Sequence, residues 1–305
     1  MLKLKEVTMM TDDTYDDAGE LFRTIRNRRG LTIRQVHGNL HKTAVSHFEN
    51  NGSDIRMTNL MTILKPTYTM PQEFFELIDH TNNRLRALSI KISNAYQQMD
   101  TATLTQLADR YANAKKDNPP RYLLKLVIKS FLSDLKHQQP VFSNEEEDYL
   151  QDYLLKAGPW FFFEYYVYSN VCFSLSKRVN DRLVQQMIRQ YDTFHLSSYD
   201  ELFFGAFYNL STKYLQRGDY QEALSMLNLV NMDKLKANVL YMRHHIAFVR
   251  LATAILSNKG AKQAREELSL LLKGTKIIDP TLYAVNINWL ESLHIDPESL
   301  DLERG

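Results

Sequence analysis

The sequence predicts an all-α protein, in which a small domain of five short helices is followed by a right-handed α-solenoid of helix pairs. Three observations support this fold class. Apolar residues recur at intervals of three and four, whereas strand-like alternation is almost absent. Ten glycines and eight prolines in 305 residues are too few for a turn-dense all-β chain. Many of them fall between the periodic segments, where breaks between helices are expected.

Length, charge and cysteine content narrow the class of protein further. A chain of 305 residues predicts about two domains, and 37 Lys and Arg against 36 Asp and Glu leave it close to neutral. The single cysteine, Cys172, excludes a disulfide framework and is expected to be a buried structural thiol. No apolar run reaches the roughly 18 residues of a membrane span, and no signal-peptide core follows Met1. We therefore expect a cytoplasmic protein without a membrane partner.

The first domain is expected over residues 16–70, after an N-terminal tail over residues 1–15. Its first helix carries apolar residues at Ala18, Leu21, Phe22 and Ile25, and Gly30 ends it. Thr32 is a good N-cap for the second helix. Later helices are predicted to end at Asn51-Gly52 and at Pro66, and Pro71 opens the next one. The compact set of five short helices extends over about residues 16–80.

The second domain is expected over residues 71–296, before a C-terminal tail over residues 297–305. Its helices are longer and come in pairs with short connections, which is typical of an α-solenoid. They are predicted at about 72–99, 101–115, 121–137, 143–156, 160–177, 180–194, 199–216, 219–230, 235–257, 260–272 and 280–293. Gly218, Gly260, Gly274 and Pro280 are among the predicted breaks.

The first domain concentrates positive charge in an otherwise neutral chain. Between Leu21 and Lys65 there are eight cations and two anions, Glu49 and Asp54, which gives a local charge of +6. Clustered cations are what phosphate binding by counterion release requires. The order helix, turn, short helix, turn, short helix is also the order of a helix-turn-helix domain. Charge alone is equally consistent with a solvated basic face.

The pattern from Gly30 to Gly52 resembles the lambda-repressor-like helix-turn-helix family. It reads Gly30-Leu31-Thr32-Ile33-Arg34-Gln35-Val36, then Val45-Ser46-His47-Phe48-Glu49-Asn50-Asn51-Gly52. The resemblance implies that Leu31, Val36, Val45 and Phe48 are core residues, and that Glu49 tethers the recognition helix within the domain. Two features depart from the family: His37, followed by Gly38, stands where the middle of the second helix commonly carries alanine, and the turn to the recognition helix is a residue or two short.

The recognition helix implied by this resemblance runs from about Lys42 to Asn50. Its outward positions can meet base edges, and a cation at the start of the preceding helix is placed for a phosphate. The expected DNA-binding residues are Arg34, Lys42, Thr43, Ser46 and His47. His37, His41 and His47 are not expected to bind metal, because no cysteine or carboxylate cluster accompanies them.

Residues 207–227 resemble the tetratricopeptide-repeat consensus. The matching residues are Phe207, Leu210-Ser211, Tyr214, Gly218-Asp219-Tyr220 and Ala223. A lambda-repressor-like domain joined to such a repeat domain resembles the Rgg-type transcriptional regulators of Gram-positive bacteria. That resemblance implies a homodimer held largely by the repeat domain, which binds double-stranded promoter DNA. It also implies a short, often hydrophobic signalling peptide in the concave groove.

The first helix of each repeat pair is expected to line that groove. Asparagine amides match the N–H and C=O groups of an extended peptide, lysine and arginine can hold a carboxylate, and aromatic rings supply apolar walls. The expected peptide-binding residues are Lys125, Lys129, Tyr166, Asn170, Phe173, Tyr208, Asn209 and Arg250. Asn170 and Asn209 lie one repeat apart, which indicates a clamp on the peptide backbone.

Other functions remain open at this point. The sequence contains no Gly-rich phosphate loop, no His-Glu-x-x-His motif and no Gly-x-Ser-x-Gly motif, so neither an enzyme nor a cofactor is expected. One alternative is a protein-interaction scaffold whose helix-turn-helix has lost DNA binding, which His37 and the short turn favour. Another is a DNA-binding regulator with a protein ligand or with no ligand, in which the two asparagines are incidental.

Overall fold

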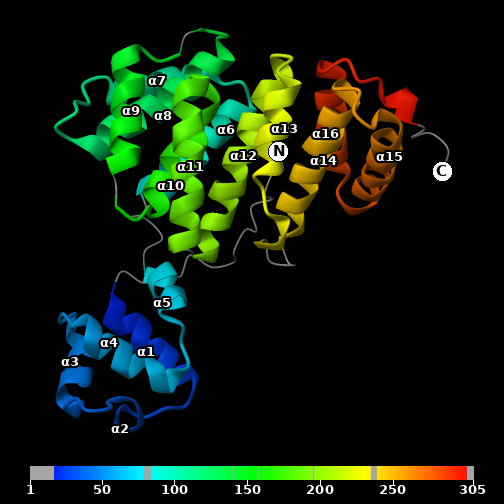
Figure 1. Cartoon of the computed structure of the whole chain (residues 1–305). Helices are drawn as coiled ribbons and strands as arrows, with labels where there is room; N and C mark the ends of the chain where they lie inside the picture. Colours follow the sequence, from blue (N-terminus) through cyan, green and yellow to red (C-terminus); the bar gives the residue numbers. More distant parts are fainter. Residues whose placement is uncertain are drawn as a thin grey trace. The chain divides into compact units, whose positions relative to one another are not determined.

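A computed structural model describes residues 17–78, 84–139, 141–156, 158–194, 196–234 and 239–300. The described residues form helices, turns and loops, and they include no β-strand (Figure 1). The all-α prediction is confirmed for this part of the chain. Two compact units divide the chain between Lys91 and Ile92, within helix α6 (Arg84–Gln97). The expected tail over residues 1–15 lies outside the described residues.

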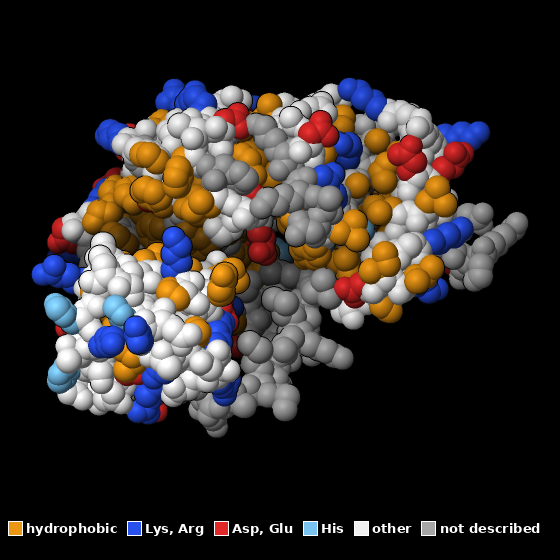
Figure 2. Space-filling model, turned by 90° about the horizontal axis from the view of Figure 1, so that it is seen from below, with side chains coloured by type: hydrophobic (Ala, Val, Ile, Leu, Met, Phe, Trp, Pro, Cys, Tyr) orange, Lys and Arg blue, Asp and Glu red, His pale blue; other side chains and the backbone are white. Residues whose placement is uncertain are grey.

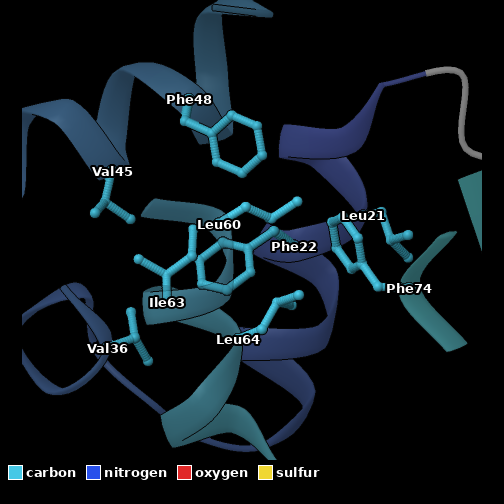
Figure 3. Close-up of a cluster of buried hydrophobic side chains, with 9 residues drawn as sticks. All are labelled: Leu21, Phe22, Val36, Val45, Phe48, Leu60, Ile63, Leu64 and Phe74. Atoms are coloured by element: carbon cyan, nitrogen blue, oxygen red, sulfur yellow. The ribbon is translucent and has the colours of Figure 1, made fainter. Parts of the chain in front are cut away.

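Among its described residues, the N-terminal unit contains five complete α-helices, one short 3₁₀ helix and the first part of α6. They are α1 (Ala18–Arg28), α2 (Ile33–Val36), α3 (Lys42–Asn51), α4 (Met57–Leu64), η1 (Lys65–Thr67) and α5 (Pro71–Ile78). Their buried faces meet in one core, in which Phe22 and Val36 have no exposed surface (Figure 3). Phe74 of α5 is also fully buried in that core. The N-terminal unit therefore continues beyond residue 70, where the sequence placed the boundary.

Helix ends in this unit follow their local sequence. The Asp17 carboxylate accepts hydrogen bonds from the backbone N–H groups of Gly19 and Glu20, at 2.6 and 3.4 Å, and so caps α1. Gly52, at φ +58°, ends α3 in the left-handed conformation that glycine tolerates best. Gly19 has a different role, because a Cβ atom there would overlap the carbonyl oxygen of Phe48. Only glycine allows α1 and α3 to approach this closely.

The C-terminal unit consists of longer helices. They are α7 (Thr101–Tyr111), α8 (Pro119–Leu135), α9 (Asn144–Lys156), α10 (Phe162–Val171), α11 (Lys177–Thr193), α12 (Asp200–Gln216), α13 (Tyr220–Asn228), α14 (Leu240–Leu256), α15 (Ala261–Ile278) and α16 (Pro280–Ser292). Short 3₁₀ helices lie between some of them, namely η2 (Cys172–Ser174), η3 (Ser197–Tyr199) and η4 (Met232–Lys234), and η5 (Pro297–Leu300) follows α16.

These helices pack as successive antiparallel pairs in two layers. Helices α8, α10, α12 and α14 lie side by side in one layer, and α9, α11 and α13 cover them on the other side (Figure 1). Trp160 is fully buried between the layers and packs edge-on against Tyr165 and Tyr168. Cys172 is fully buried as expected, and burial raises the pKa of its thiol. The layering confirms the expected solenoid of helix pairs.

Three predicted helix boundaries were wrong. The single helix expected over 72–99 is two helices, α5 and α6, and residues 79–83 between them lie outside the described part. Gly274 does not end a helix but lies inside α15. A mid-helix glycine costs only about 1 kcal/mol, and buried Leu272 and Thr275 on either side outweigh that cost.

The boundary between α10 and α11 also differs from the sequence prediction. A helix was expected over 160–177, but α10 ends at Val171 and α11 begins at Lys177. Buried Asn180 stabilises this break, because its amide donates to the carbonyl oxygens of Cys172 at 2.8 Å and Leu175 at 3.3 Å. The pattern of apolar residues could not predict this break, because the break depends on hydrogen bonds from a polar side chain to the preceding loop.

The expected C-terminal tail over 297–305 begins with ordered structure. Residues Pro297–Leu300 form η5, which packs against α15 and α16, and Leu300 is buried. Apolar burial at Leu300 is enough to hold this turn on the last repeat. The remaining residues of that expected tail, 301–305, lie outside the described part of the chain.

Candidate functional site

Helix α3 presents the predicted DNA-reading side chains on its outer face. Its inner face buries Val45, Phe48 and Glu49 in the N-terminal unit. The 3.6-residue period then turns Lys42, Thr43 and His47 outward, where all three are exposed. Ser46 is half-buried, and Arg34 is exposed on α2. The structure therefore brings four of the five expected residues onto α3 and leaves Arg34 on the adjoining helix.

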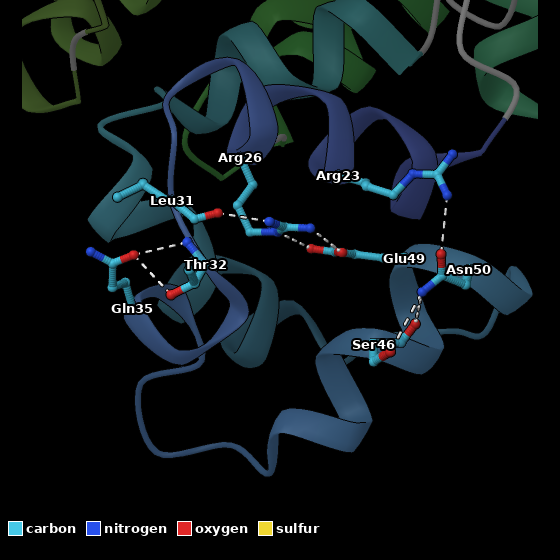
Figure 4. Close-up of polar contacts among 8 residues, drawn as sticks. All are labelled: Arg23, Arg26, Leu31, Thr32, Gln35, Ser46, Glu49 and Asn50. Atoms are coloured by element: carbon cyan, nitrogen blue, oxygen red, sulfur yellow. Dashed lines mark hydrogen bonds and ion pairs between the residues drawn. The ribbon is translucent and has the colours of Figure 1, made fainter.

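A buried ion pair fixes α3 against α1. The Arg26 guanidinium donates from Nε and Nη2 to the two carboxylate oxygens of Glu49, at 2.6 and 2.7 Å, and from Nη1 to the Leu31 carbonyl oxygen at 2.7 Å (Figure 4). Only 1% of the Glu49 side chain is exposed. The hydrogen bond with Glu49 outweighs burial and raises the pKa of Arg26. Glu49 is thus the internal tether implied by the family resemblance.

Two asparagines at the end of α3 were missed by the sequence reading. Asn50 accepts a hydrogen bond from Arg23 Nη1 at 3.0 Å and donates to the Ser46 carbonyl oxygen at 2.8 Å (Figure 4). Asn51 Nδ2 lies 2.9 Å from His47 Nδ1. The signal was the i, i+4 spacing of residues 46 and 50 and of 47 and 51, which places each pair on one face. These contacts orient Asn50 and the His47 ring.

The remaining cations of this unit are available to solvent. With Arg26 buried on Glu49, seven of the eight cations between Leu21 and Lys65 remain, and Asp54 is the one other anion in that segment. Six of them are exposed: Arg28, Arg29, Arg34, Lys42, Arg56 and Lys65. Lys, Arg and His side chains gather on the N-terminal unit in Figure 2. This local excess of charge suits a phosphate backbone.

The two predicted clamp asparagines lie on neighbouring helices of the layer that α8, α10, α12 and α14 form, which we call the α8–α14 layer. Asn209 of α12 donates from Nδ2 to the Ser169 carbonyl oxygen of α10 at 3.0 Å, and Asn170 donates to the Tyr166 carbonyl oxygen at 2.7 Å. Both side chains are half-buried. Within the described part of the chain neither Oδ1 atom accepts a hydrogen bond. Each amide therefore keeps acceptor capacity for a ligand N–H group.

The three predicted cations contact other helices. Lys125 donates to the Ala112 carbonyl oxygen at the end of α7, at 2.9 Å, and Arg250 donates to the Leu227 carbonyl oxygen of α13 at 3.0 Å. Lys129 pairs with Glu146 of α9 at 2.6 Å. Burial disfavours the Glu146 carboxylate, but hydrogen bonds from Lys129 and Ser143 lower its pKa overall. These contacts turn the cations toward α7, α9 and α13.

The three predicted aromatic residues are each engaged by other rings. Tyr166 is buried and stacks on Phe162, with 6.5 Å between ring centroids. Phe173 packs against Phe131 of α8 at 5.6 Å, and Tyr208 lies 4.9 Å from the His245 ring of α14. Burial raises the pKa of Tyr208 to about 12. These rings are spread along the α8–α14 layer, and the three predicted aromatic residues do not meet in one cluster.

An acid that the sequence analysis missed connects three helices. Asp134 of α8 accepts from Lys213 Nζ of α12 at 2.6 Å and from the Tyr96 hydroxyl of α6 at 2.6 Å. Burial and this hydrogen bond raise the pKa of Tyr96, so its hydroxyl keeps its proton. Lys213 follows Asn209 by four residues, so the spacing could have placed Lys213 on the same helix face as Asn209, but it could not have revealed Asp134.

Comparison with known proteins identifies the family of this chain. A family model described as the C-terminal domain of the HTH-type transcriptional regulator Rgg matches residues 104–282, which is more than half of the chain. The chain belongs to the Rgg family. No curated protein matches its sequence. None of its described helices is long and apolar enough to span a membrane.

Solved structures share the fold of this Rgg-family chain at low sequence identity. A candidate transcriptional regulator from Listeria monocytogenes EGD-e aligns with a TM-score of 0.74 and 19% identity, over 92% of this chain and 100% of the other. The pheromone receptor Rgg2 of Streptococcus dysgalactiae aligns with a TM-score of 0.71 and 18% identity, over 91% and 99%. PrgX in complex with cCF10 aligns with a TM-score of 0.69 and 15% identity, over 91% and 92%. These TM-scores establish a shared fold.

Proposed function

We propose that this Rgg-family chain is a cytoplasmic, homodimeric transcriptional regulator that binds double-stranded promoter DNA through α3. The observation that carries the proposal is the outer face of α3, where Lys42, Thr43 and His47 are exposed while Arg26 and Glu49 anchor the helix from inside. A fixed helix with such a face suits the major groove, and exposed cations nearby suit the phosphates. Membership of a regulator family supports this role over that of an enzyme.

We further propose that a short, hydrophobic signalling peptide modulates this regulator. Rgg2 is described as a pheromone receptor, and PrgX was crystallised with the ligands cCF10 and iCF10. In this chain the support comes from Asn170 and Asn209, whose free acceptor atoms lie on adjacent helices one repeat apart. Such amides can bind a peptide backbone whatever its side chains.

DNA binding is tested by neutralising two cations separately. Lys42→Ala and Arg34→Ala are each expected to weaken binding to a DNA duplex selected by the wild-type protein from a random library. Each is expected to reduce the slope of log K against log salt by about 1, because one phosphate contact is lost. The measurement is fluorescence anisotropy at salt concentrations from about 50 to 200 mM, a range that includes physiological ionic strength.

Lys156→Ala is the matched control for this experiment. Lys156 is an exposed cation of the C-terminal unit that pairs with Asp152 on the same helix. Its removal should leave the salt slope unchanged. A wild-type protein that selects no duplex would support the scaffold alternative, and equal slopes for all variants would remove Lys42 and Arg34 from the DNA interface.

The asparagine clamp predicts a loss of peptide affinity. Asn170→Ala and Asn209→Ala are each expected to weaken binding about tenfold, or about 1.4 kcal/mol, because a buried peptide N–H loses its acceptor. Titration calorimetry with synthetic peptides encoded beside the gene measures this change. Asn231→Ala, at an exposed loop position, is the control and should bind normally. Unchanged affinity in both clamp variants would favour a regulator without a peptide at this site.

A further inference from the structure

The last turn of α3 carries two asparagines that have different contacts. Asn50 uses both ends of its amide inside the N-terminal unit, because Oδ1 accepts from Arg23 Nη1 at 3.0 Å and Nδ2 donates to the Ser46 carbonyl oxygen at 2.8 Å (Figure 4). Asn51 instead directs Nδ2 to Nδ1 of the His47 ring, 2.9 Å away. The Asn50 amide is therefore structural, whereas the Asn51 amide acts on an exposed side chain of the proposed DNA-binding face.

The contact with Asn51 determines which nitrogen of the neutral His47 ring carries the proton. An amide nitrogen can only donate a hydrogen bond, so Nδ1 of His47 accepts it. The ring proton is then on Nε2, at the other side of the ring. Nε2 has no hydrogen-bond partner among the described residues, and His47 is exposed. The ring therefore presents one N–H donor to solvent on the outer face of α3.

His37 in the same unit has the opposite arrangement. Its Nδ1 lies 2.8 Å from the Leu40 carbonyl oxygen. A carbonyl oxygen can only accept, so the proton of a neutral His37 ring is on Nδ1 and its Nε2 is left as an acceptor. The two histidines thus differ in tautomer, and His37 is an internal reference for the tautomer of His47.

Two contacts with α1 fix the turn of α3 from which Asn51 projects. The Glu49 carboxylate is buried on Arg26, and the Asn50 amide is bonded to Arg23 (Figure 4). Both residues directly precede Asn51, so the backbone at residue 51 is fixed relative to α1. A ring oriented by such a residue loses little conformational entropy on binding, and it discriminates better between ligands than a freely rotating ring.

A single fixed donor on a recognition helix can distinguish between the four bases. In the major groove guanine offers two adjacent acceptors, N7 and O6. Adenine places a donor beside its N7, cytosine offers a donor, and thymine offers O4 beside a methyl group. The neutral His47 ring cannot accept from a base, since Asn51 already occupies its acceptor nitrogen. Guanine is therefore the base that best fits the Nε2–H group.

We infer that His47 reads a guanine in the major groove through Nε2–H, and that Asn51 is the positioning residue that sets the tautomer and orientation of the ring. This inference rests on the proposed DNA-binding function of α3. Thr43 lies one helical turn before His47, a rise of about 5.4 Å, and successive base pairs are about 3.4 Å apart. The guanine thus lies one or two base pairs from the base that faces Thr43.

Selection of DNA by the full-length protein tests the base preference. The wild-type protein and its variants each select duplexes from a random library at about pH 8, where an unperturbed histidine is neutral, and the selected duplexes are sequenced. The wild-type protein is expected to favour guanine over adenine about fivefold at one position of its site. His47→Leu should lose this preference, and His47→Gln should change it to adenine, because glutamine presents both a donor and an acceptor. Asn27→Leu, at an exposed position of α1, is the matched control and should select like the wild-type protein.

A double-mutant cycle tests the role of Asn51. Asn51→Leu is expected to reduce the guanine preference about twofold, because the His47 ring becomes free to rotate. The same substitution in the His47→Leu background should have no further effect on base preference, since Asn51 acts only through His47. If Asn51→Leu weakens binding to all duplexes equally in both backgrounds, Asn51 is structural and does not position the ring.

Nuclear magnetic resonance measures the tautomer without DNA. Proton–nitrogen correlation spectra of the full-length protein labelled at histidine are recorded at about pH 8 and assigned with His37→Gln and His47→Gln. His47 is expected to show a protonated Nε2 and an unprotonated Nδ1, and His37 the reverse. A protonated Nδ1 in His47 would overturn the inference whatever DNA the protein selects.

The outcomes separate this inference from the function on which it rests. A wild-type protein that selects no duplex would overturn the proposed DNA binding and the inference with it. If the wild-type protein selects duplexes but His47→Leu keeps the same preference at every position, α3 binds DNA without a guanine contact from His47, and only the inference fails. Thermal denaturation checks that each variant is folded, and His47→Gln provides a second, polar replacement of the ring.

Discussion

Arg26→Met is expected to lower the free energy of unfolding of the N-terminal unit by about 3–5 kcal/mol. The substitution removes three hydrogen bonds, to both Glu49 carboxylate oxygens and to the Leu31 carbonyl. It leaves the Glu49 charge buried without a partner, and this penalty is larger than the value of the bonds. Because Trp160 and Trp289 both lie in the C-terminal unit, the unfolding of the N-terminal unit is followed by far-UV circular dichroism in urea.

A second substitution distinguishes the buried charge from lost packing. Glu49→Leu in the Arg26→Met background should recover most of the lost stability, since apolar replacements of a buried pair are often neutral. The control is Lys156→Met, which breaks the exposed pair with Asp152 and should change stability by no more than about 0.5 kcal/mol. A double variant as unstable as Arg26→Met alone would show that Glu49 is not the source of the penalty.

Trp160→Ala is expected to destabilise the C-terminal unit by about 3–5 kcal/mol. The indole has no exposed surface, and its Nε1–H donates to the Leu154 carbonyl oxygen at 3.0 Å. Its removal would leave a cavity beside Tyr165 and Tyr168, whose ring centroids lie 5.4 and 5.8 Å away. Fluorescence of the remaining Trp289 in urea measures the change.

Two further variants test the cavity explanation. Trp160→Phe keeps an aromatic ring in the site but loses the hydrogen bond, so it should cost clearly less than Trp160→Ala. Phe162→Ala removes a ring that is 43% exposed two residues away and should cost least. If Phe162→Ala were as destabilising as Trp160→Ala, burial would not explain the effect.

Much of the N-terminal unit could be predicted from its sequence, because its core depends on local periodicity. The predicted core residues Val36, Val45 and Phe48 are buried, and Leu31 packs against them half-buried. Helix period fixes which residues face inward once a helix is placed. The same period could not show that Arg26 turns inward, since that position depends on a carboxylate 23 residues later.

The groove charges were harder to predict for a different reason. Periodicity placed Lys125 and Lys129 on a helix of the correct layer, but a lysine side chain is long enough to reach a neighbouring helix on either side. Lys129 forms an ion pair with Glu146, and Lys125 donates a hydrogen bond to the Ala112 carbonyl oxygen at the end of α7. The partner of Lys213 lies 79 residues earlier in the chain, beyond any local pattern. Long-range charge pairing therefore required three-dimensional coordinates.

The lack of a side chain at Gly19 allows α1 and α3 to approach closely, and this spacing affects the position of the proposed DNA-binding face. A single added carbon at that position would push against the backbone of α3 at Phe48, next to the Glu49 tether. The position of α3 relative to α1 therefore depends on the absence of a Cβ atom at residue 19. If α3 binds DNA as proposed, selectivity for an operator would depend on the spacing between α1 and α3 as well as on the α3 residues that face the DNA.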